Sequence, residues 1–362
     1  MRIIHTADLH LDSTLSTNLD SNIQKERRRE LLYNFKRLIN YAIDNGIHII
    51  LISGDLFDNN RISLKTKSYI LGLIEENSSI DFFYVAGNRD EESFLLSIDN
   101  KPKNLKIFSD TWTTYSYDEF DITGINFNDV SEKYMYTTLS LKKDKLNIVM
   151  LNGPIEGEGK IDISELKNKN IDYLALGHIH NYKRESFDTR GILVYPGCLE
   201  GRDFDEIGKK GFSLLEINNY TIIDQFVEFA KRTLYNIDVD ITELDSWTDV
   251  KKLVMKNIKE ISHEDIIQIT LKGYYDLDLI KQIDILEDNL KDTYYFARII
   301  DESKLKINPQ QYENDISLKG EFIRNVLASK FNPDEKNKII EYGIKALMKE
   351  EIWYEVIKYL YW

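Results

Sequence analysis

Apolar runs alternate with amphipathic stretches in the first part of the chain. Residues 47–54 form a continuous apolar run, as expected of a strand buried on both faces, and 1–7 and 82–87 also fit short strands. Apolar residues recur at helical spacing over 22–45, and a second helix fits 63–77. The alternation of strands and helices predicts βαβ units and a central sheet covered by helices.

The rest of the chain is predicted to contain strands first and helices last. Seven segments separated by turn residues fit strands, namely 106–110, 119–127, 146–153, 171–177, 192–197, 211–217 and 221–229. Further along, strands alternate again with helices near 249–261 and 277–290. We therefore expect a first domain over residues 1–232, a small α/β domain over 233–305 and a helical region over 306–362.

The C-terminal region fits two helices with a break at Asn332-Pro333, because proline cannot continue a helix. The last helix has an apolar stripe and several aromatic residues close to the chain end, among them Trp353 and Trp362. Two interpretations stay open. The helix either packs on its own protein or docks onto a partner helix, because such a stripe is costly to expose.

Composition narrows the class of protein. The chain has 362 residues, of which 42% are hydrophobic, and this allows two or three units. It has one cysteine, Cys198, no signal-peptide pattern at its start and no apolar run long enough for a membrane span, so we expect a cytoplasmic protein. The net charge of −14 disfavours a protein that only coats nucleic acid, although metal cations can supply positive charge at a phosphodiester.

Polar residues of a similar kind follow four of the predicted strands. The groups are Asp8, His10 and Asp12; Asp55 and Asp58; Asn88, Asp90 and Glu91; and His178 and His180. Open α/β sheets place their sites at the carboxyl ends of the strands, so we expect these groups to gather at one edge. Each group alone could consist of polar residues that are hydrogen-bonded within a turn. Four in order predict a metal site, and aspartate, histidine and asparagine without thiolates suit Mn²⁺, Fe²⁺ or Zn²⁺, and less selectively Mg²⁺.

The set of motifs D-L-H, G-D-L-F-D, G-N-x-D and G-H-I-H resembles the calcineurin-like metallophosphoesterases. The position of D-L-H close to Met1 and the segment 195–217 are similar to the SbcD-type DNA repair exonucleases, and within them to the YhaO-like branch. The resemblance implies a four-layer αββα sandwich followed by a small α/β capping domain. It also implies C-terminal helices that dock an SbcC-like coiled-coil ATPase.

The resemblance implies metal-binding roles for individual residues. The ligands of a first ion would be Asp8, His10 and His180, Asp55 would bridge two ions, and the ligands of the second ion would be Asn88 and His178. Asp12 and Asp58 are better interpreted as groups that cap loops or orient ligands. Two other histidines, His5 inside the first strand and His48, are expected to pack in the core or against a helix.

The chain departs from the family pattern at positions that matter for the chemistry. Arg89 follows Asn88 where the family has a histidine, and Asn152 stands where a later strand normally ends in a histidine ligand. Asp203 also replaces the histidine of a G-R-H segment. Arginine cannot release a proton at working pH, but it can grip phosphate oxygens and stabilise negative charge. An asparagine oxygen is a poorer ligand than imidazole for Mn²⁺ or Fe²⁺.

We therefore predict one well-held ion, with Mn²⁺ as the first choice, on the ligands of the first site together with Asp55. The second position, which Asn88, Asn152 and His178 would serve, is predicted to be weak or empty, with Arg89 as a phosphate clamp. The predicted function is that of a metal-dependent DNA exonuclease or phosphodiesterase, with an early helix such as 23–43 able to form a homodimer. The alternatives are a catalytically weak subunit that binds DNA ends and a small-molecule phosphodiesterase.

Overall fold

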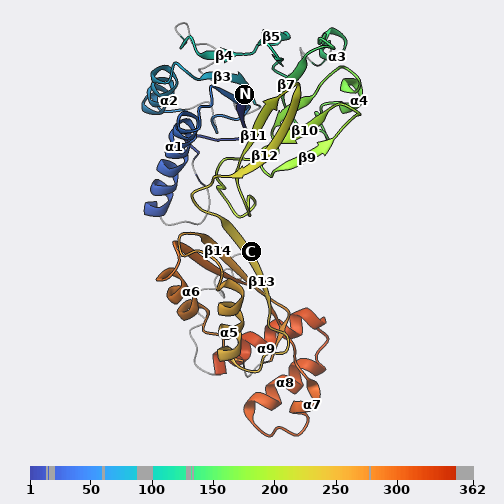
Figure 1. Cartoon of the computed structure of the whole chain (residues 1–362). Coiled ribbons are helices and arrows are strands. Elements are labelled where there is room, and N and C mark those ends of the chain that lie inside the picture. Colours follow the sequence, from blue (N-terminus) through green and yellow to red (C-terminus); the bar gives the residue numbers. More distant parts are fainter. Residues whose placement is uncertain are drawn as a thin grey trace. The chain divides into compact units, whose positions relative to one another are not determined.

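The computed structural model describes residues 1–13, 15, 21–58, 62–87, 101–127, 132, 134–276 and 279–347. The chain divides into two compact units, Met1–Leu234 and Tyr235–Trp362, whose elements are labelled in Figure 1. Two predicted site residues, Asn88 and Arg89, lie outside the described residues, as does the end of the last predicted helix. None of the described helices is long and apolar enough to cross a membrane.

The first unit contains two six-stranded sheets. The strands of the first sheet are, in spatial order, β12 (Thr221–Glu228), β11 (Gly211–Asn218), β1 (Arg2–Thr6), β2 (Ile49–Ser53), β3 (Asp81–Val85) and β4 (Leu105–Ile107). Those of the second are β5 (Thr113–Ser116), β6 (Phe120–Gly124), β7 (Leu146–Asn152), β8 (Tyr173–Gly177), β10 (Ile192–Tyr195) and β9 (Lys183–Ser186). The central strands are parallel within each sheet, so their carboxyl ends lie along one edge.

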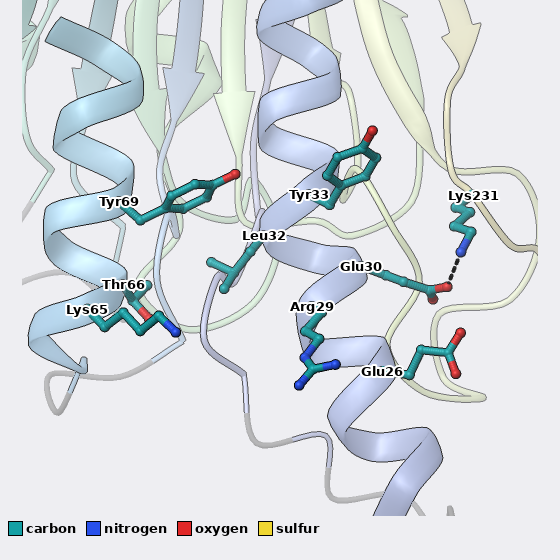
Figure 2. A pocket seen from close by; sticks show the side chains of 9 residues that line it. All are labelled: Glu26, Arg29, Glu30, Leu32, Tyr33, Lys65, Thr66, Tyr69 and Lys231. Carbon is teal, nitrogen blue, oxygen red and sulfur yellow. Dashed lines mark hydrogen bonds and ion pairs between the residues drawn. The ribbon is translucent and has the colours of Figure 1, made fainter. Parts of the chain in front are cut away.

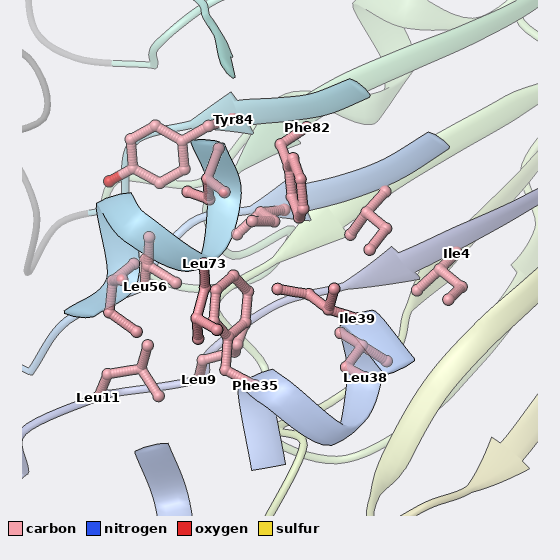
Figure 3. Packing of buried hydrophobic residues seen from close by; sticks show 14 of the residues in the cluster. Ile4, Leu9, Leu11, Phe35, Leu38, Ile39, Leu56, Leu73, Phe82 and Tyr84 are labelled. Carbon is pink, nitrogen blue, oxygen red and sulfur yellow. The ribbon is translucent and has the colours of Figure 1, made fainter. Parts of the chain in front are cut away.

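The outer face of the first sheet is covered by two helices, α1 (Ser21–Asp44) and α2 (Leu64–Glu76). Their apolar side chains, including Phe35 and Ile39 of α1 and Leu73 of α2, pack against strand residues such as Ile4 and Phe82 (Figure 3). This contact forms because apolar residues repeat at helical spacing on one face of each helix. This packing holds in place the sheet that contains β1 and β2, the strands that precede two of the loops at the site.

Alternate residues of each strand face opposite layers, as the pleat of a strand requires. In β3, Phe82 and Tyr84 join the cluster under the helices, whereas Phe83 joins a second cluster between the two sheets. In β7, Ile148 lies between the sheets and Val149 joins a third cluster on the far face of the second sheet. The strands are therefore apolar on both faces, which explains why their sequences show continuous apolar runs.

Among the described residues, the far face carries two short helices, α3 (Met135–Thr138) and α4 (Ile163–Leu166), with loop residues packed around them. Helix, sheet, sheet and helix follow one another from α1 to α4. The predicted four-layer αββα sandwich is thus confirmed, with a thin outer layer on this side. The helices that position the site are those on the side of the first sheet.

The second unit contains a three-stranded sheet and a helical part. The elements of the sheet part are β13 (Leu234–Asp240), α5 (Trp247–Ile258), β14 (Ile266–Lys272), α6 (Ile283–Lys291) and β16 (Phe296–Asp301). The remaining elements are β15 (Tyr274–Tyr275), β17 (Lys304–Leu305), α7 (Pro309–Tyr312), α8 (Leu318–Ala328) and α9 (Pro333–Leu347). The two parts have separate apolar clusters, and the predicted boundary between domains at 305 and 306 stays a prediction.

Some elements differ from the prediction. The strands β5 and β9 were not predicted, because they lie at the two edges of the second sheet and consist largely of polar residues. An edge strand pairs on one side only and buries less apolar surface, so its sequence carries a weak strand pattern. Helix α6 begins at Ile283, later than the pattern from 277 onward suggests.

Candidate metal centre

The loops that follow β1, β2 and β8 meet at the carboxyl edge of the two sheets. The N–H of Asp8 donates to the carbonyl oxygen of Gly54 at 3.1 Å, and the N–H of His10 donates to that of Asp55 at 2.9 Å. The loop after β8 joins them, because the N–H of His178 donates to both carboxylate oxygens of Asp8, at 3.0 and 3.1 Å. Strand ends of both sheets therefore bring their polar residues together, as predicted for open α/β sheets.

Three potential ligand atoms at this edge lie within 4.8 Å of one another. They belong to Asp8, His10 and His180, and within the described part of the chain this is the one group of His, Cys, Asp and Glu residues that meets this distance. Asp8 and His10 are buried, and His180 is half-buried. The Nε2 atoms of the two histidines are 3.1 Å apart. These are the residues predicted to hold the first ion.

The opposite nitrogen of each histidine contacts a carboxylate. His180 Nδ1 is 2.7 Å from Oε1 of Glu206. His10 Nδ1 is 3.1 Å from Oδ1 of Asp58, which is within ion-pair distance. If each Nδ1 carries the proton that faces its carboxylate, both Nε2 atoms present lone pairs to the same point. A divalent cation beside the Asp8 carboxylate relieves that repulsion, so the residues present fit a metal ion.

Burial and the neighbouring charges shift the pKa values of the three residues. Burial raises the pKa of Asp8 to about 7 and lowers the pKa of His10. Burial is also the largest single influence on His180 and lowers its pKa, but the hydrogen bond to Glu206 and the negative charges of Asp8 and Glu206 together outweigh it, so the pKa of His180 is raised. A cation at this point would favour the carboxylate form of Asp8 and the neutral form of the imidazoles.

The site residues adopt backbone conformations that are uncommon for residues with side chains. The φ angles are 51° at Asp8, 45° at His10, 47° at Asp55 and 107° at His178. Conformations of this kind cost about 1–3 kcal/mol each and concentrate at functional sites. Close packing accompanies the strain, because a Cβ atom at Gly87 would lie 2.2 Å from Oδ1 of Asp55. Only glycine leaves room for this carboxylate.

The other predicted ligands lie near the group of three but outside it. Asp55 is buried, and its charge adds to the rise in the pKa of Asp8 and partly offsets the fall in the pKa of His10 that burial causes. Asn152 donates from Nδ2 to the carbonyl oxygen of Ser53 at 2.9 Å, which leaves Oδ1 as the atom that could meet a cation. The assignments of Asp55, His178 and Asn152 as ligands stay predictions. Those of Asn88 and Arg89 fall outside the described residues.

Three charged residues beside the site were not predicted from the sequence: Arg202, Glu206 and Lys210. Arg202 donates from Nη2 to Oε1 of Glu206 at 2.5 Å and from Nη1 to Oδ1 of Asp58 at 2.9 Å. Lys210 is buried and donates from Nζ to the carbonyl oxygen of His180 at 2.9 Å. All three lie in the segment 195–217 that carried the resemblance, but no local pattern there identifies their partners.

The expectation for His48 is wrong, because its side chain is exposed. Two other expectations about single residues are confirmed. His5 is fully buried, with Nδ1 2.9 Å from the hydroxyl of Tyr173 and Nε2 3.1 Å from that of Ser53, so it is a core histidine. Asp12 accepts a hydrogen bond from the N–H of Ser63 at 3.1 Å and so connects the loop after β1 to the start of α2.

Comparison with known proteins agrees with this geometry. The sequence model of the family described as "Calcineurin-like phosphoesterase" matches residues 1–182, which is more than half of the chain and includes every predicted ligand. The family consists generally of hydrolases that use divalent metals, and the group of Asp8, His10 and His180 fits such a metal.

Similar proteins of known sequence include DNA repair proteins. The chain is 26% identical over 297 residues to "Uncharacterized metallophosphoesterase YhaO" of Bacillus subtilis, covering 75% of this chain and 72% of that protein. It is 22% identical over 365 residues to "DNA double-strand break repair protein Mre11" of Sulfolobus acidocaldarius, covering 94% of both. It is 21% identical over 369 residues to the SbcD component of the SbcCD nuclease of Staphylococcus epidermidis, covering 88% of this chain and 89% of that protein.

Proposed function

The chain belongs to the calcineurin-like phosphoesterase family, and on this basis we propose that it is a metal-dependent DNA exonuclease or phosphodiesterase. The observation that carries the proposal is the group of ligand atoms from Asp8, His10 and His180, which lie within 4.8 Å of one another at the sheet edge. Relatives named as a DNA double-strand break repair protein and as a component of a nuclease each align with most of the chain and favour DNA as the substrate.

The chain's own residues would prepare the site for hydrolysis. A divalent cation held by Asp8, His10 and His180, with Asp55 beside it, would supply Lewis acidity that polarises a phosphodiester and makes water a better nucleophile. The N–H of His178 holds both oxygens of Asp8 and so fixes the direction of this carboxylate. Glu206 keeps the proton of His180 on Nδ1, which leaves Nε2 free as a ligand atom.

Arg89 is proposed as a clamp for the phosphate. The guanidinium can bond two phosphate oxygens at once and can offset the negative charge that develops in the transition state. It cannot protonate the leaving oxygen, because its pKa is above about 12. Hydrolysis by this chain would therefore rely on water for that proton, and we expect a lower rate than with a histidine at this position.

We also propose that the site holds one ion well and a second ion weakly. Nδ2 of Asn152 donates to Ser53, so Asn152 can offer only one neutral oxygen to a cation. The arginine at position 89 adds a positive charge that disfavours a second cation. Mn²⁺ is the first candidate for the well-held ion because the ligands are two imidazoles and carboxylates, with Fe²⁺, Mg²⁺ and Zn²⁺ as the alternatives.

The partner is proposed to be an SbcC-like coiled-coil ATPase that docks on the C-terminal helices. Several large apolar side chains around α8 and α9 are exposed, including Ile316, Leu318 and Phe331. Exposed apolar side chains in one region of the chain favour an interaction site there. A pull-down with the ATPase, using the full chain and a chain that ends near Leu305, tests this. Equal capture of both chains would argue against docking on these helices.

A homodimer through α1 is also proposed. A cavity of about 650 Å³ lies between α1 and α2, and its lining residues include Leu32, Tyr33, Tyr69, Arg29 and Lys65 (Figure 2). Tyr33 is 55% exposed, so its ring offers apolar area on α1 to a second copy of the chain. Light scattering at several concentrations should show a dimer that Tyr33→Glu converts to a monomer. A parent chain that stays monomeric at high micromolar concentration would contradict this.

A second candidate function is a catalytically weak subunit that binds DNA ends. The departures at Arg89 and Asn152 favour this function. Arg89 replaces the histidine that would protonate the leaving group, and Asn152 replaces a histidine ligand of the second metal ion. A small-molecule phosphodiesterase is a further alternative, and the alignment with DNA repair proteins over both units disfavours it.

The deciding experiment is a nuclease assay on linear duplex DNA with and without Mn²⁺. We expect slow, Mn²⁺-dependent degradation by the parent and none by Asp55→Ala. The double variant Arg89→His, Asn152→His should be faster. A parent without activity and an active double variant would favour the weak subunit, and no activity in either, together with hydrolysis of a small phosphodiester, would favour the third function. His48→Gln is the control, because His48 is exposed and its Nδ1 lies 3.0 Å from the carbonyl oxygen of Ser79, outside the site.

A further inference from the structure

A closed ring of side-chain contacts surrounds the point at which the two histidines meet. It passes from His10 to Asp58 (3.1 Å), from Asp58 to Arg202 (2.9 Å), from Arg202 to Glu206 (2.5 Å) and from Glu206 to His180 (2.7 Å). The two Nε2 atoms, 3.1 Å apart, close the ring. Its members come from the loops after β1, β2, β8 and β10, so the ring ties four separate loops together.

Arg202 is the member that joins the two halves of this ring. Its Nη2 and Nε both approach Oε1 of Glu206, at 2.5 and 3.1 Å, while Nη1 bonds Asp58. The backbone N–H of Arg202 also donates to Oε2 of Glu206 at 2.7 Å. The side chain of Arg202 is 15% exposed and that of Glu206 is 8% exposed, so both have given up most of their contact with water.

We propose that Arg202 is a positioning residue that, through Asp58 and Glu206, holds the imidazoles of His10 and His180 in the orientation needed to bind one metal ion. The inference rests on the proposed function, because it assumes that Asp8, His10 and His180 hold a cation. It assigns to Arg202 a role that requires no contact with metal or substrate. Each carboxylate fixes one histidine, and the planar fork of the guanidinium fixes the two carboxylates relative to each other.

The positive charge of Arg202 would weaken metal binding, whereas its positioning role would strengthen it. A cationic side chain near a metal site repels the metal ion. Removal of the Arg202 side chain would leave the carboxylates of Asp58 and Glu206 as two uncompensated negative charges, which attract the metal ion. If charge were the main effect, loss of Arg202 would tighten metal binding. If position is the main effect, loss of Arg202 weakens it, because the carboxylates separate and no longer hold the imidazoles. The sign of the change therefore decides between the two.

The experiment measures the Kd of Mn²⁺ for the metal-free full chain by calorimetry. We expect Arg202→Met to raise the Kd about 10-fold to 100-fold, the range typical when a group that orients metal ligands is lost. Arg202→Lys keeps the charge but cannot bond both carboxylates in a fork, so its Kd should also rise, by a smaller factor. Arg184→Met is the matched control. Arg184 lies on the edge strand β9 and pairs with Asp224 at 2.9 Å, so this substitution should leave the Kd of Mn²⁺ unchanged.

A second measurement follows the geometry of the ligands directly. With Co²⁺ in place of Mn²⁺, the visible absorption bands of Arg202→Met should shift in wavelength and intensity, whereas those of Arg184→Met should match the parent. A purely structural role of Arg202 would lower the melting temperature and leave these bands unchanged. If Arg202→Met does not fold, Glu206→Gln takes its place, with an expected rise in Kd of about 10-fold.

The outcomes separate this inference from the proposed function. A parent that binds no Mn²⁺ overturns the metal centre itself. A parent that binds Mn²⁺, together with an Arg202→Met variant whose Kd is unchanged or lower, overturns only the positioning role of Arg202. Weaker binding in Arg202→Met and in Arg202→Lys, with an unchanged control, supports the inference.

Discussion

The close contact between the two sheets beneath the metal centre can be tested by replacing Gly177 with alanine. Gly177 ends β8, and a Cβ atom at this position would lie 1.5 Å from the carbonyl oxygen of Ser53 at the end of β2. It would also lie 2.8 Å from Nδ2 of Asn152, which donates to the same carbonyl oxygen. Neither neighbour can turn away easily, because one is backbone and the other is held by it. The two strands would have to separate.

The expected loss of stability follows from this geometry. Overpacking a core costs about 1–3 kcal/mol, and the upper end applies here because the obstacle is a backbone carbonyl in a central strand. A weakened bond between Asn152 and Ser53 adds about 1 kcal/mol. For a unit the size of Met1–Leu234, each kcal/mol lowers the melting temperature by about 2–4 °C. Gly177→Ala should therefore melt about 8–16 °C below the parent.

Differential scanning calorimetry of the metal-free chain measures the shift, and Gly72→Ala provides the control. Gly72 lies inside α2, and no atom lies within 4 Å of the position that its Cβ would take. The same chemical change there should stabilise the helix by about 0.5–1 kcal/mol. If Gly177→Ala melts within about 2 °C of the parent, the ends of β2 and β8 are not packed this closely. The convergence of their loops on one site would then lose its basis.

Three further outcomes are expected. His180→Gln should raise the Kd of Mn²⁺ at least about 10-fold, whereas His48→Gln should leave it unchanged; equal affinities would exclude His180 as a ligand. Burial lowers the pKa of His5 to about 3, whereas in the unfolded chain it titrates near 6.5, so the unfolded state binds the extra proton and stability falls as the pH drops below 6.5. His5→Gln should remove about 2 kcal/mol of the difference in unfolding free energy between pH 7 and pH 5, measured in urea, and an unaltered pH dependence would contradict this. Arg27→Met should destabilise the chain by about 3–5 kcal/mol in the same assay, because buried Arg27 bonds Glu30 at 2.6 Å and Glu200 at 2.9 Å; a loss below about 1 kcal/mol, as expected for an exposed pair, would refute it.

The main elements of the fold could be predicted from the sequence because their patterns are local. The helix α1 shows its buried face through apolar residues at helical spacing, and β2 shows burial on both faces through a continuous apolar run. The edge strands β5 and β9 could not be predicted in this way. Their pairing depends on a neighbouring strand rather than on their own apolar residues.

In the candidate site, too, local sequence motifs reveal some residues, whereas others are brought there only by the tertiary structure. By itself, the sequence determined the potential ligands, since Asp8, His10 and His180 each follow an apolar strand within a short motif. It also determined which residues depart from the family pattern, among them Arg89 and Asn152. Only the tertiary structure decided which side chains surround those ligands. Glu206 lies 26 residues from His180, and Arg202 lies 144 residues from Asp58, and no periodic pattern spans such separations. The backbone positions that bring them together are set by how the two sheets pack, and that packing is a property of the whole fold.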